Sequence, residues 1–285
     1  MFLPRRHFFP LLVAPLLADD AIPASTTLRT SFWGPLDQQL INWLAPRPGQ
    51  AVLDAGCGQG DHLLPIARLL RGPGAVGLDK NEDALRIARL RAAATGLSRS
   101  IRFVPGDLYQ PPFPPATFDL VWSSHVLHGL PDIDRAVGQL ATLLKPGGRL
   151  VLRENRVPQS LLPRDTGSVP PGLEARLQAA FERWFLADRV QRGRYPAGWL
   201  AALSQAGLKN PTAKSFLYER NAPFSPLEQQ YLTGWLRRYA NYEGVDPADA
   251  AYVARLLDPQ HPDWLFARRD LHFLSVSTVY FAHKR

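Results

Sequence analysis

The sequence has very little cysteine and no long apolar run. Its 285 residues contain one cysteine, Cys57. A single cysteine excludes an internal disulfide and a zinc site built on paired cysteines, so a reducing cytoplasm is the expected location. No apolar run approaches the roughly 20 residues that a membrane-spanning helix needs. With 46% hydrophobic and 20% charged residues, the composition is typical of a soluble globular protein rather than a disordered one.

Metal-binding motifs and lysine are also scarce. The seven histidines have no cysteine or carboxylate at ligand spacing, so we expect no metal. The 33 Lys and Arg residues outnumber the 25 Asp and Glu residues by eight, which is a net charge of +8. A basic balance can attract nucleic acid, but only five of these residues are lysines and the arginines are scattered. We therefore expect a solvated surface, with no nucleic-acid or membrane partner.

The N-terminus resembles an export signal only in part. Arg5 and Arg6 precede an apolar stretch from Phe8 to Ala18, as in a twin-arginine signal. Pro10 and Pro15 interrupt this stretch and Pro4 precedes it, two aspartates follow it directly, and no small-x-small cleavage site ends it. We expect residues 1–50 to form a helical extension that packs over the body of the protein.

Short apolar runs alternate with helical patterns from Ala51 to Glu154, and this alternation is typical of βα units that build a parallel sheet. Asn81 and Asp132 are plausible N-caps of two of the helices. The pattern predicts a Rossmann-like, doubly wound α/β sheet. The expected strands are Ala51 to Ala55, Ala75 to Asp79, Ile101 to Pro105, Phe118 to Ser123 and Arg149 to Glu154, and the expected helices are Asp61 to Arg71, Glu82 to Thr95 and Ile133 to Leu144.

The alternation loosens after Glu154. We expect helices from Gly172 to Val190 and from Pro196 to Ala206, and a strand from Thr212 to Glu219. Two segments, 225–228 and 246–249, each read as an N-cap box with proline at the first helical position. The run from Phe273 to Ala282 predicts an antiparallel last strand. Residues 51–285 thus form one domain, with helical insertions at about 156–193 and 221–270 that make a cap.

The most informative stretch is an apolar strand that runs into three glycines and then a helix, from Val52 to Asp61. Glycine lets a ligand approach the backbone at the carboxyl end of a first parallel strand, where the next helix offers unpaired N–H groups. A dinucleotide-binding fingerprint reads G-x-G-x-x-G, whereas here the third glycine comes one place early and Asp61 occupies the expected glycine position. This spacing argues against NAD.

Two further acids follow the next strands. Asp79 stands 25 positions after Asp54, about where a nucleoside ribose needs an acceptor for its hydroxyl groups. Asp107 follows the third expected strand, where a carboxylate can accept from the amine of adenine, and Leu78 and Leu108 offer apolar surface to the ring. The predicted ligand is an adenosine.

Together these residues resemble the class I S-adenosylmethionine-dependent methyltransferases of small-molecule type. The resemblance is carried by five stretches in the right order: VLDAGCGQG, the acid at Asp79, GDL from Gly106, FDLVWSSHVLHGLPD and LLKPGGRLVL. It implies S-adenosylmethionine as cofactor. It also implies that Asp54, Gly56, Cys57 and Gly58 lie against the methionine part, that Asp79 with Lys80 holds the ribose, that Asp107 and Leu108 hold adenine, and that Ser123 or Ser124 passes near the sulfonium.

Methyl transfer from a sulfonium is an in-line displacement, so alignment and exclusion of water lower much of the barrier and a base is optional. His125 and His128 follow the fourth expected strand and are the best candidates for a base, although His128 also suits a packing role in the turn before Asp132. Cys57 is expected to pack rather than to act as a nucleophile.

We expect the residues that select the methyl acceptor to lie outside the common core. Aromatic residues gather in these outer segments. We single out Trp33, Trp235 and Tyr239 as acceptor-binding candidates, and a small hydrophobic or aromatic molecule as the acceptor. Two alternatives stay open: an RNA or protein methyltransferase, and a protein that binds the sulfonium cofactor without transferring its methyl group.

Overall fold

The computed structural model describes residues 22–154, 159–162, 169–192 and 198–285. The N-terminal stretch that resembles an export signal, and parts of the expected insertion at 156–193, lie outside these residues. In the described part of the chain no helix is both long and apolar enough to span a membrane.

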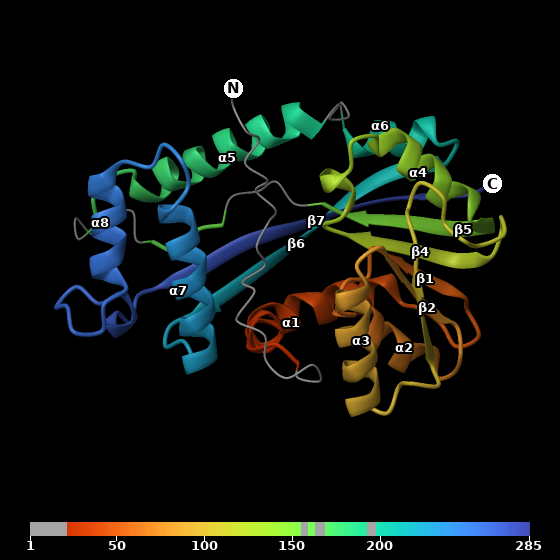
Figure 1. The fold of residues 1–285 in the computed structure, drawn as a ribbon, viewed down its shortest axis with the longest axis horizontal. Coiled ribbons are helices and arrows are strands. Elements are labelled where there is room, and N and C mark those ends of the chain that lie inside the picture. The colour runs from red at the N-terminus through yellow and green to blue at the C-terminus, as the bar shows by residue number, and fades with distance from the viewer. Residues whose placement is uncertain (1–21, 155–158, 163–168, 193–197) are drawn as a thin grey trace, which may run out of the picture.

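The centre of the molecule is a seven-stranded sheet with the order β3-β2-β1-β4-β5-β7-β6 (Figure 1). The first five strands along the chain pair in parallel, and β7 runs antiparallel to both β5 and β6. The predicted fold class, with its antiparallel last strand, is confirmed. The strands are β1 Val52–Ala55, β2 Ala75–Asp79, β3 Ile101–Pro105, β4 Phe118–Ser124, β5 Leu144–Arg153, β6 Lys209–Asn221 and β7 His272–His283.

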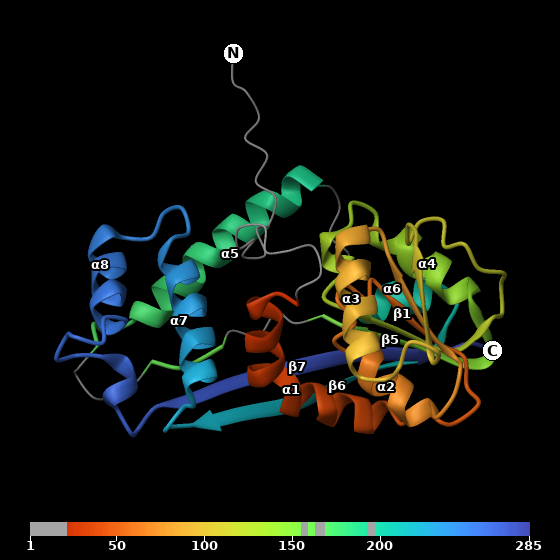
Figure 2. The ribbon, with the colours of Figure 1, turned by 60° about the horizontal axis from the view of Figure 1, so that its bottom comes forward.

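Helices cover both faces of the sheet because its strands are apolar on both sides (Figures 1 and 2). In β4, Leu120 and Trp122 belong to one buried cluster and Val121 to the other. The first cluster contains apolar residues of α1 (Ala24–Leu44) and α2 (Leu63–Leu70), on the face where α3 (Glu82–Ala94) also lies. The second contains residues of α4 (Ile133–Thr142) and α6 (Trp199–Gln205). Because both faces of the sheet are covered, a ligand can reach the sheet only at the ends of its strands.

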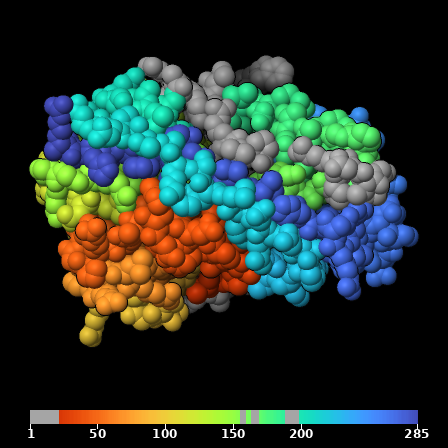
Figure 3. Space-filling model, turned by 180° about the vertical axis from the view of Figure 1, so that it is seen from behind, coloured from red at the N-terminus to blue at the C-terminus, as the bar shows by residue number. Residues whose placement is uncertain are grey.

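Three helices lie beyond the carboxyl ends of the parallel strands. They are α5 (Leu173–Arg192), α7 (Pro226–Ala240) and α8 (Pro247–Leu256), and the last two connect β6 to β7 (Figure 1). Helix α1 lies beside β6 and α7, and Figure 3 shows its red and orange atoms in contact with the cyan ones of those segments. Two short 3-10 turns, Leu127–Gly129 and Leu265–Ala267, complete the described elements.

The predicted helix caps are mostly confirmed. The side chains of Asn81 and Asp132 accept from the backbone N–H groups three residues on, and Ser225 forms a capping box with Glu228. The box predicted at Asp246 is wrong in one part. Asp246 caps α8, but Asp249 forms an ion pair with Arg176 of α5, at 2.7 Å, and so ties two helices together.

Candidate active site

The glycine turn joins β1 to the segment that leads into α2, and its backbone requires glycine. Gly56 and Gly58 have φ of +79° and +51°, in the left-handed region. A Cβ added to Gly56 would lie 2.4 Å from a methyl carbon of Val126, so the turn packs directly against the segment that follows β4. A Cβ at Gly58 would meet no described atom within 4 Å. The space beside Gly58 is therefore open to a ligand.

Behind this turn lies a buried carboxylate. Asp54 is 1% exposed, and its Oδ2 has no hydrogen-bond partner among the described residues. Burial, together with the charges of Asp79 and Asp61, raises the pKa of Asp54 well above its usual range. A buried acceptor oxygen beside an open backbone turn fits a ligand that brings its own N–H donors, such as the amino group of S-adenosylmethionine.

The acids that follow β2 and β3 lie at the same edge of the sheet, because Asp79 pairs in register with Pro105. The carboxylate of Asp79 accepts from the backbone N–H groups of Gly58 (2.8 Å) and Asn81 (2.9 Å). Asp107 is exposed and accepts from the backbone N–H of Tyr109 at 2.9 Å. Leu108 is buried, and Lys80 is exposed next to Asp79.

Two serines and a cysteine complete the inner side of the turn. Ser123 is fully buried and donates to the carbonyl of Ala55 at 2.9 Å, whereas the buried Oγ of Ser124 finds no partner among the described residues. Burial, with the charges of Asp54 and Asp79, raises the pKa of the Cys57 thiol far above its usual range. The thiol stays protonated, so Cys57 has no nucleophilic character near neutral pH.

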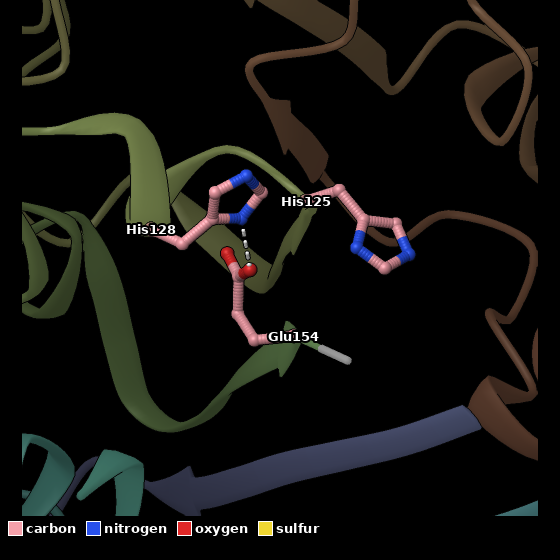
Figure 4. Close-up of side chains that lie close together, drawn as sticks. All are labelled: His125, His128 and Glu154. Atoms are coloured by element: carbon pink, nitrogen blue, oxygen red, sulfur yellow. Dashed lines mark hydrogen bonds and ion pairs between the residues drawn. The ribbon is translucent and has the colours of Figure 1, made fainter. Parts of the chain in front are cut away.

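His128 has a buried carboxylate partner. Its Nδ1 donates to Oε2 of Glu154 at 2.7 Å (Figure 4). The other oxygen of Glu154 accepts from the backbone N–H groups of Val126 (3.2 Å) and Leu127 (2.9 Å). Glu154 thus holds the turn between β4 and α4 and orients the imidazole. The side chain of Glu154 is 2% exposed and that of His128 is 29% exposed, so the histidine still reaches solvent.

His125 comes from the same turn and is held differently. It has a left-handed backbone, with φ of 56°, and its N–H donates to the carbonyl of Arg153 at 2.9 Å. One ring nitrogen of His125 faces the side of His128 and Glu154 (Figure 4) and lies within 4.8 Å of a ligand atom of each. The side chain of His125 is exposed.

A buried ionic network connects α1 to β5. Nη1 of Arg153 donates to Oδ1 of Asp37 at 2.7 Å and lies 3.0 Å from Nε2 of His62. Arg29 reaches both Asp37 (3.3 Å) and Asp61 (2.9 Å). Burial opposes ionisation of Asp37, but the neighbouring His62, Arg153 and Arg29 lower its pKa far below its usual range. The network fixes α1 against the residues that follow the glycine turn.

The three acceptor-binding candidates lie in two aromatic groups. Trp33 is 7% exposed and donates to the hydroxyl of Tyr231 at 2.5 Å, within a buried group of α1, β6, α7 and β7. Tyr239, partly buried, packs against Phe181 of α5, with ring centres 5.4 Å apart. Trp235 is buried between the two groups, against Phe273 and Tyr239.

The structure therefore brings most predicted residues to the carboxyl edge of the sheet. Asp54, the glycine turn, Asp79, Asp107 and the two histidines all follow strands of this edge. The sequence analysis missed Glu154, Arg153 and Asp37 as residues of the site. Glu154 follows β5, which pairs with β4, so the strand-end argument applied to the other acids also places it beside His128.

Comparison with known proteins gives the same family. Residues 53–152 match the family described as Methyltransferase domain. Aklanonic acid methyltransferase DauC from Streptomyces sp. (strain C5) is 34% identical over 171 residues, which cover 58% of this chain and 76% of that protein. The 2-phytyl-1,4-naphtoquinone methyltransferase from Synechococcus elongatus is 34% identical over 125 residues, which cover 44% and 54%. This chain spans about half the length of several other curated relatives that it matches.

The fold is shared with solved structures. The YcgJ protein from Bacillus subtilis aligns with a TM-score of 0.56 at 18% identity, over 88% of this chain and 99% of that one. The sequence match to aklanonic acid methyltransferase, the Methyltransferase domain and the glycine turn agree. The chain belongs to the class I S-adenosylmethionine-dependent methyltransferases.

Proposed function

We propose that this methyltransferase moves the methyl group of S-adenosylmethionine to a small hydrophobic or aromatic molecule by in-line displacement. One observation carries the proposal: the buried Oδ2 of Asp54, which has no hydrogen-bond partner among the described residues, lies behind a glycine turn with open space beside Gly58. When bound, the sulfonium supplies an activated methyl group. The protein then has to align the acceptor and keep water out.

Different residues at the edge of the sheet bind different parts of the cofactor. Asp54, Gly56, Cys57 and Gly58 hold the methionine part, and Ser123 and Ser124 lie on the inner side of the same turn. Asp79, with Lys80 beside it, accepts from the ribose hydroxyl groups. Asp107 and Leu108 hold the adenine. Asp79 suits its role because its carboxylate is already fixed by two backbone N–H groups and remains partly exposed.

The acceptor class is supported by the aromatic residues around the site. Phe185 lies 6.1 Å from the ring centre of His128, and Phe181 packs against both Phe185 and Tyr239. The names of two relatives point the same way, since one is specified for aklanonic acid and the other for a phytyl naphthoquinone. Helix α1 and the helical segments within 156–193 and 221–270 form the cover over this site.

Calorimetric titration tests the cofactor assignment. We expect heat of binding with S-adenosylmethionine or S-adenosylhomocysteine and none with NAD or NADP. Asp79→Ala should weaken cofactor binding by about 1 to 3 kcal/mol, because charge-assisted hydrogen bonds to the ribose are lost. Asp263→Ala is the control, since the Asp263 side chain is 56% exposed in a loop before β7. Heat with NAD alone, or equal binding by wild type and Asp79→Ala, would contradict the proposal.

A further inference from the structure

His128 is oriented by the carboxylate of Glu154, which hydrogen bonds hold on both of its oxygens. Glu154 receives two backbone N–H groups on one oxygen and Nδ1 of His128 on the other. An ionised carboxylate only accepts, so the proton of the neutral imidazole sits on Nδ1 and Nε2 carries the lone pair. Nε2 points away from Glu154 (Figure 4). The turn therefore presents a proton acceptor of fixed direction.

This proton acceptor belongs to the segment that packs on the glycine turn. Val126, between the two histidines, fills the space next to Gly56. The same histidine also borders an aromatic cluster, defined as Phe181, Trp184, Phe185, Tyr239 and Tyr242. Phe181 lies 5.9 Å from Phe185, 5.4 Å from Tyr239 and 5.3 Å from Tyr242, as ring-centre distances. An aromatic molecule that packs against Phe185 would lie near His128, because the two ring centres are 6.1 Å apart.

We propose that the methyl acceptor is a flat aromatic molecule with a phenol-type hydroxyl group, and that His128, oriented by Glu154, removes the proton from that hydroxyl. The inference rests on the proposed function and adds to it the class of acceptor, the proton acceptor and a positioning residue. A base contributes only when the acceptor atom has to lose a proton, so a carboxylate acceptor would have no use for this pair. A phenolic hydroxyl, with a pKa of about 10 in tyrosine, is close enough to imidazole for such a transfer.

The hydroxyl proton moves to Nε2 of His128. The oxygen electron pair forms the bond to the methyl carbon, and the electron pair of the broken carbon–sulfur bond stays on sulfur. The products are the aryl methyl ether, S-adenosylhomocysteine and protonated His128, which releases its proton to water. The charge of Glu154 stabilises the imidazolium while it exists.

Two substitutions remove the proton-accepting role of His128 while they keep the hydrogen bonds that hold the turn. In His128→Asn the amide still donates to Glu154, but no group remains to accept the proton. In Glu154→Gln the amide oxygen still accepts from Val126 and Leu127, while the amide NH₂ faces Nδ1 of His128. An NH₂ group requires Nδ1 to accept, so the ring proton moves to Nε2 and the base is lost. Glu219→Gln is the matched control, since Glu219 lies 3.3 Å from His272 in an exposed pair far along the sheet.

The first measurement is ¹⁵N NMR of the histidine rings in the chain without cofactor. Neutral His128 should carry its proton on Nδ1 in the wild type and on Nε2 in Glu154→Gln, with no change in Glu219→Gln. An Nε2-protonated ring in the wild type would overturn the orienting role of Glu154. This readout does not depend on methyl transfer, so its failure is separate from failure of cofactor binding.

The second measurement is steady-state methylation of 1-naphthol, with 1-naphthoate as a probe that has no proton to lose. His128→Asn and Glu154→Gln should each lower kcat for 1-naphthol by roughly a hundredfold or more, with KM within a few-fold, and should change any turnover of 1-naphthoate far less. Phe185→Ala should raise KM for 1-naphthol by roughly threefold to tenfold. Absence of naphthol turnover by a chain that binds S-adenosylmethionine would overturn the acceptor class.

The donor atoms of His125, His128 and Glu154 lie within 4.8 Å of one another, so the same groups offer a cation three ligands. Methylation of 1-naphthol should continue in excess EDTA. Activity that disappears with EDTA and returns with a divalent metal would overturn the metal-free base. Full activity of His128→Asn would also overturn it, and would leave alignment alone as the mechanism.

Discussion

At the scale of single residues, Asp37 shows how strongly one carboxylate can support this fold. It is 5% exposed and is the counter-charge of Arg153, which is 2% exposed. Asp37→Asn would remove the carboxylate that is bonded to the buried guanidinium, and we expect a loss of about 3 to 5 kcal/mol in the free energy of unfolding. Chemical denaturation measures it. Glu82→Gln, which breaks an exposed ion pair with Arg89, should cost less than about 1 kcal/mol. Equal losses in the two variants would show that the buried ion pair of Asp37 contributes no more to the free energy of unfolding than an exposed ion pair does.

A residue that directly follows a predicted strand can be assigned to the edge of the sheet from the sequence alone. A residue whose role depends on a partner far away in the sequence cannot be assigned in this way. Asp54, Asp79 and Asp107 follow expected strands, so their common edge was predictable. Asp37 meets Arg153 across 116 positions of sequence. In the sequence, Asp37 is an acidic residue on the otherwise apolar side of a helix. This position indicates that its side chain is buried, but it does not identify the partner. The αL conformation of His125 was also beyond prediction, since histidine adopts it only where the surrounding structure holds it.

At the scale of helices and strands, apolar periodicity and caps identified nearly every described element. The capping box at Ser225 located the start of α7, and Asn81 located that of α3. The packing of α5 on α7 was not predictable. It depends on ring contacts between residues more than 50 positions apart, such as Phe181 and Tyr239, and each ring suits a core or a binding surface equally well from sequence.

Helix α7 is expected to affect the acceptor and not the cofactor, because Tyr239 contacts the α5 rings and lies on a different element from the glycine turn. Tyr239→Leu should raise KM for 1-naphthol several-fold and leave the Kd of S-adenosylmethionine within about twofold. Kinetics at saturating cofactor and calorimetry measure the two quantities. Tyr252→Leu on α8, where Arg255 stacks on the tyrosine ring at 4.9 Å, is the control. A variant that loses cofactor affinity while keeping its acceptor KM would contradict this division.

At the scale of the whole molecule, the buried charges make stability depend on pH. Burial lowers the pKa of His62, against the opposing effect of Asp37. Below about pH 6.5 the unfolded chain therefore binds a proton at this histidine that the folded chain does not, and the free energy of unfolding falls with pH by up to about 1.4 kcal/mol per unit. Asp37 does not add to the loss in this window. Its own pKa is lowered, so its stabilisation is present above about pH 4 and disappears only as the pH falls further.

Denaturation midpoints at pH 7.5, 6.5 and 5.5 test this assignment. The wild type should lose stability between pH 6.5 and 5.5. His62→Asn should be less stable at pH 7.5, because the ring packs against Trp122 with centres 5.4 Å apart. Its stability should nevertheless fall less steeply below pH 6.5, because the substituted side chain takes up no proton in either state. An equal slope in the two proteins would mean that His62 titrates alike in the folded and unfolded chains. The pH sensitivity would then come from other titrating groups.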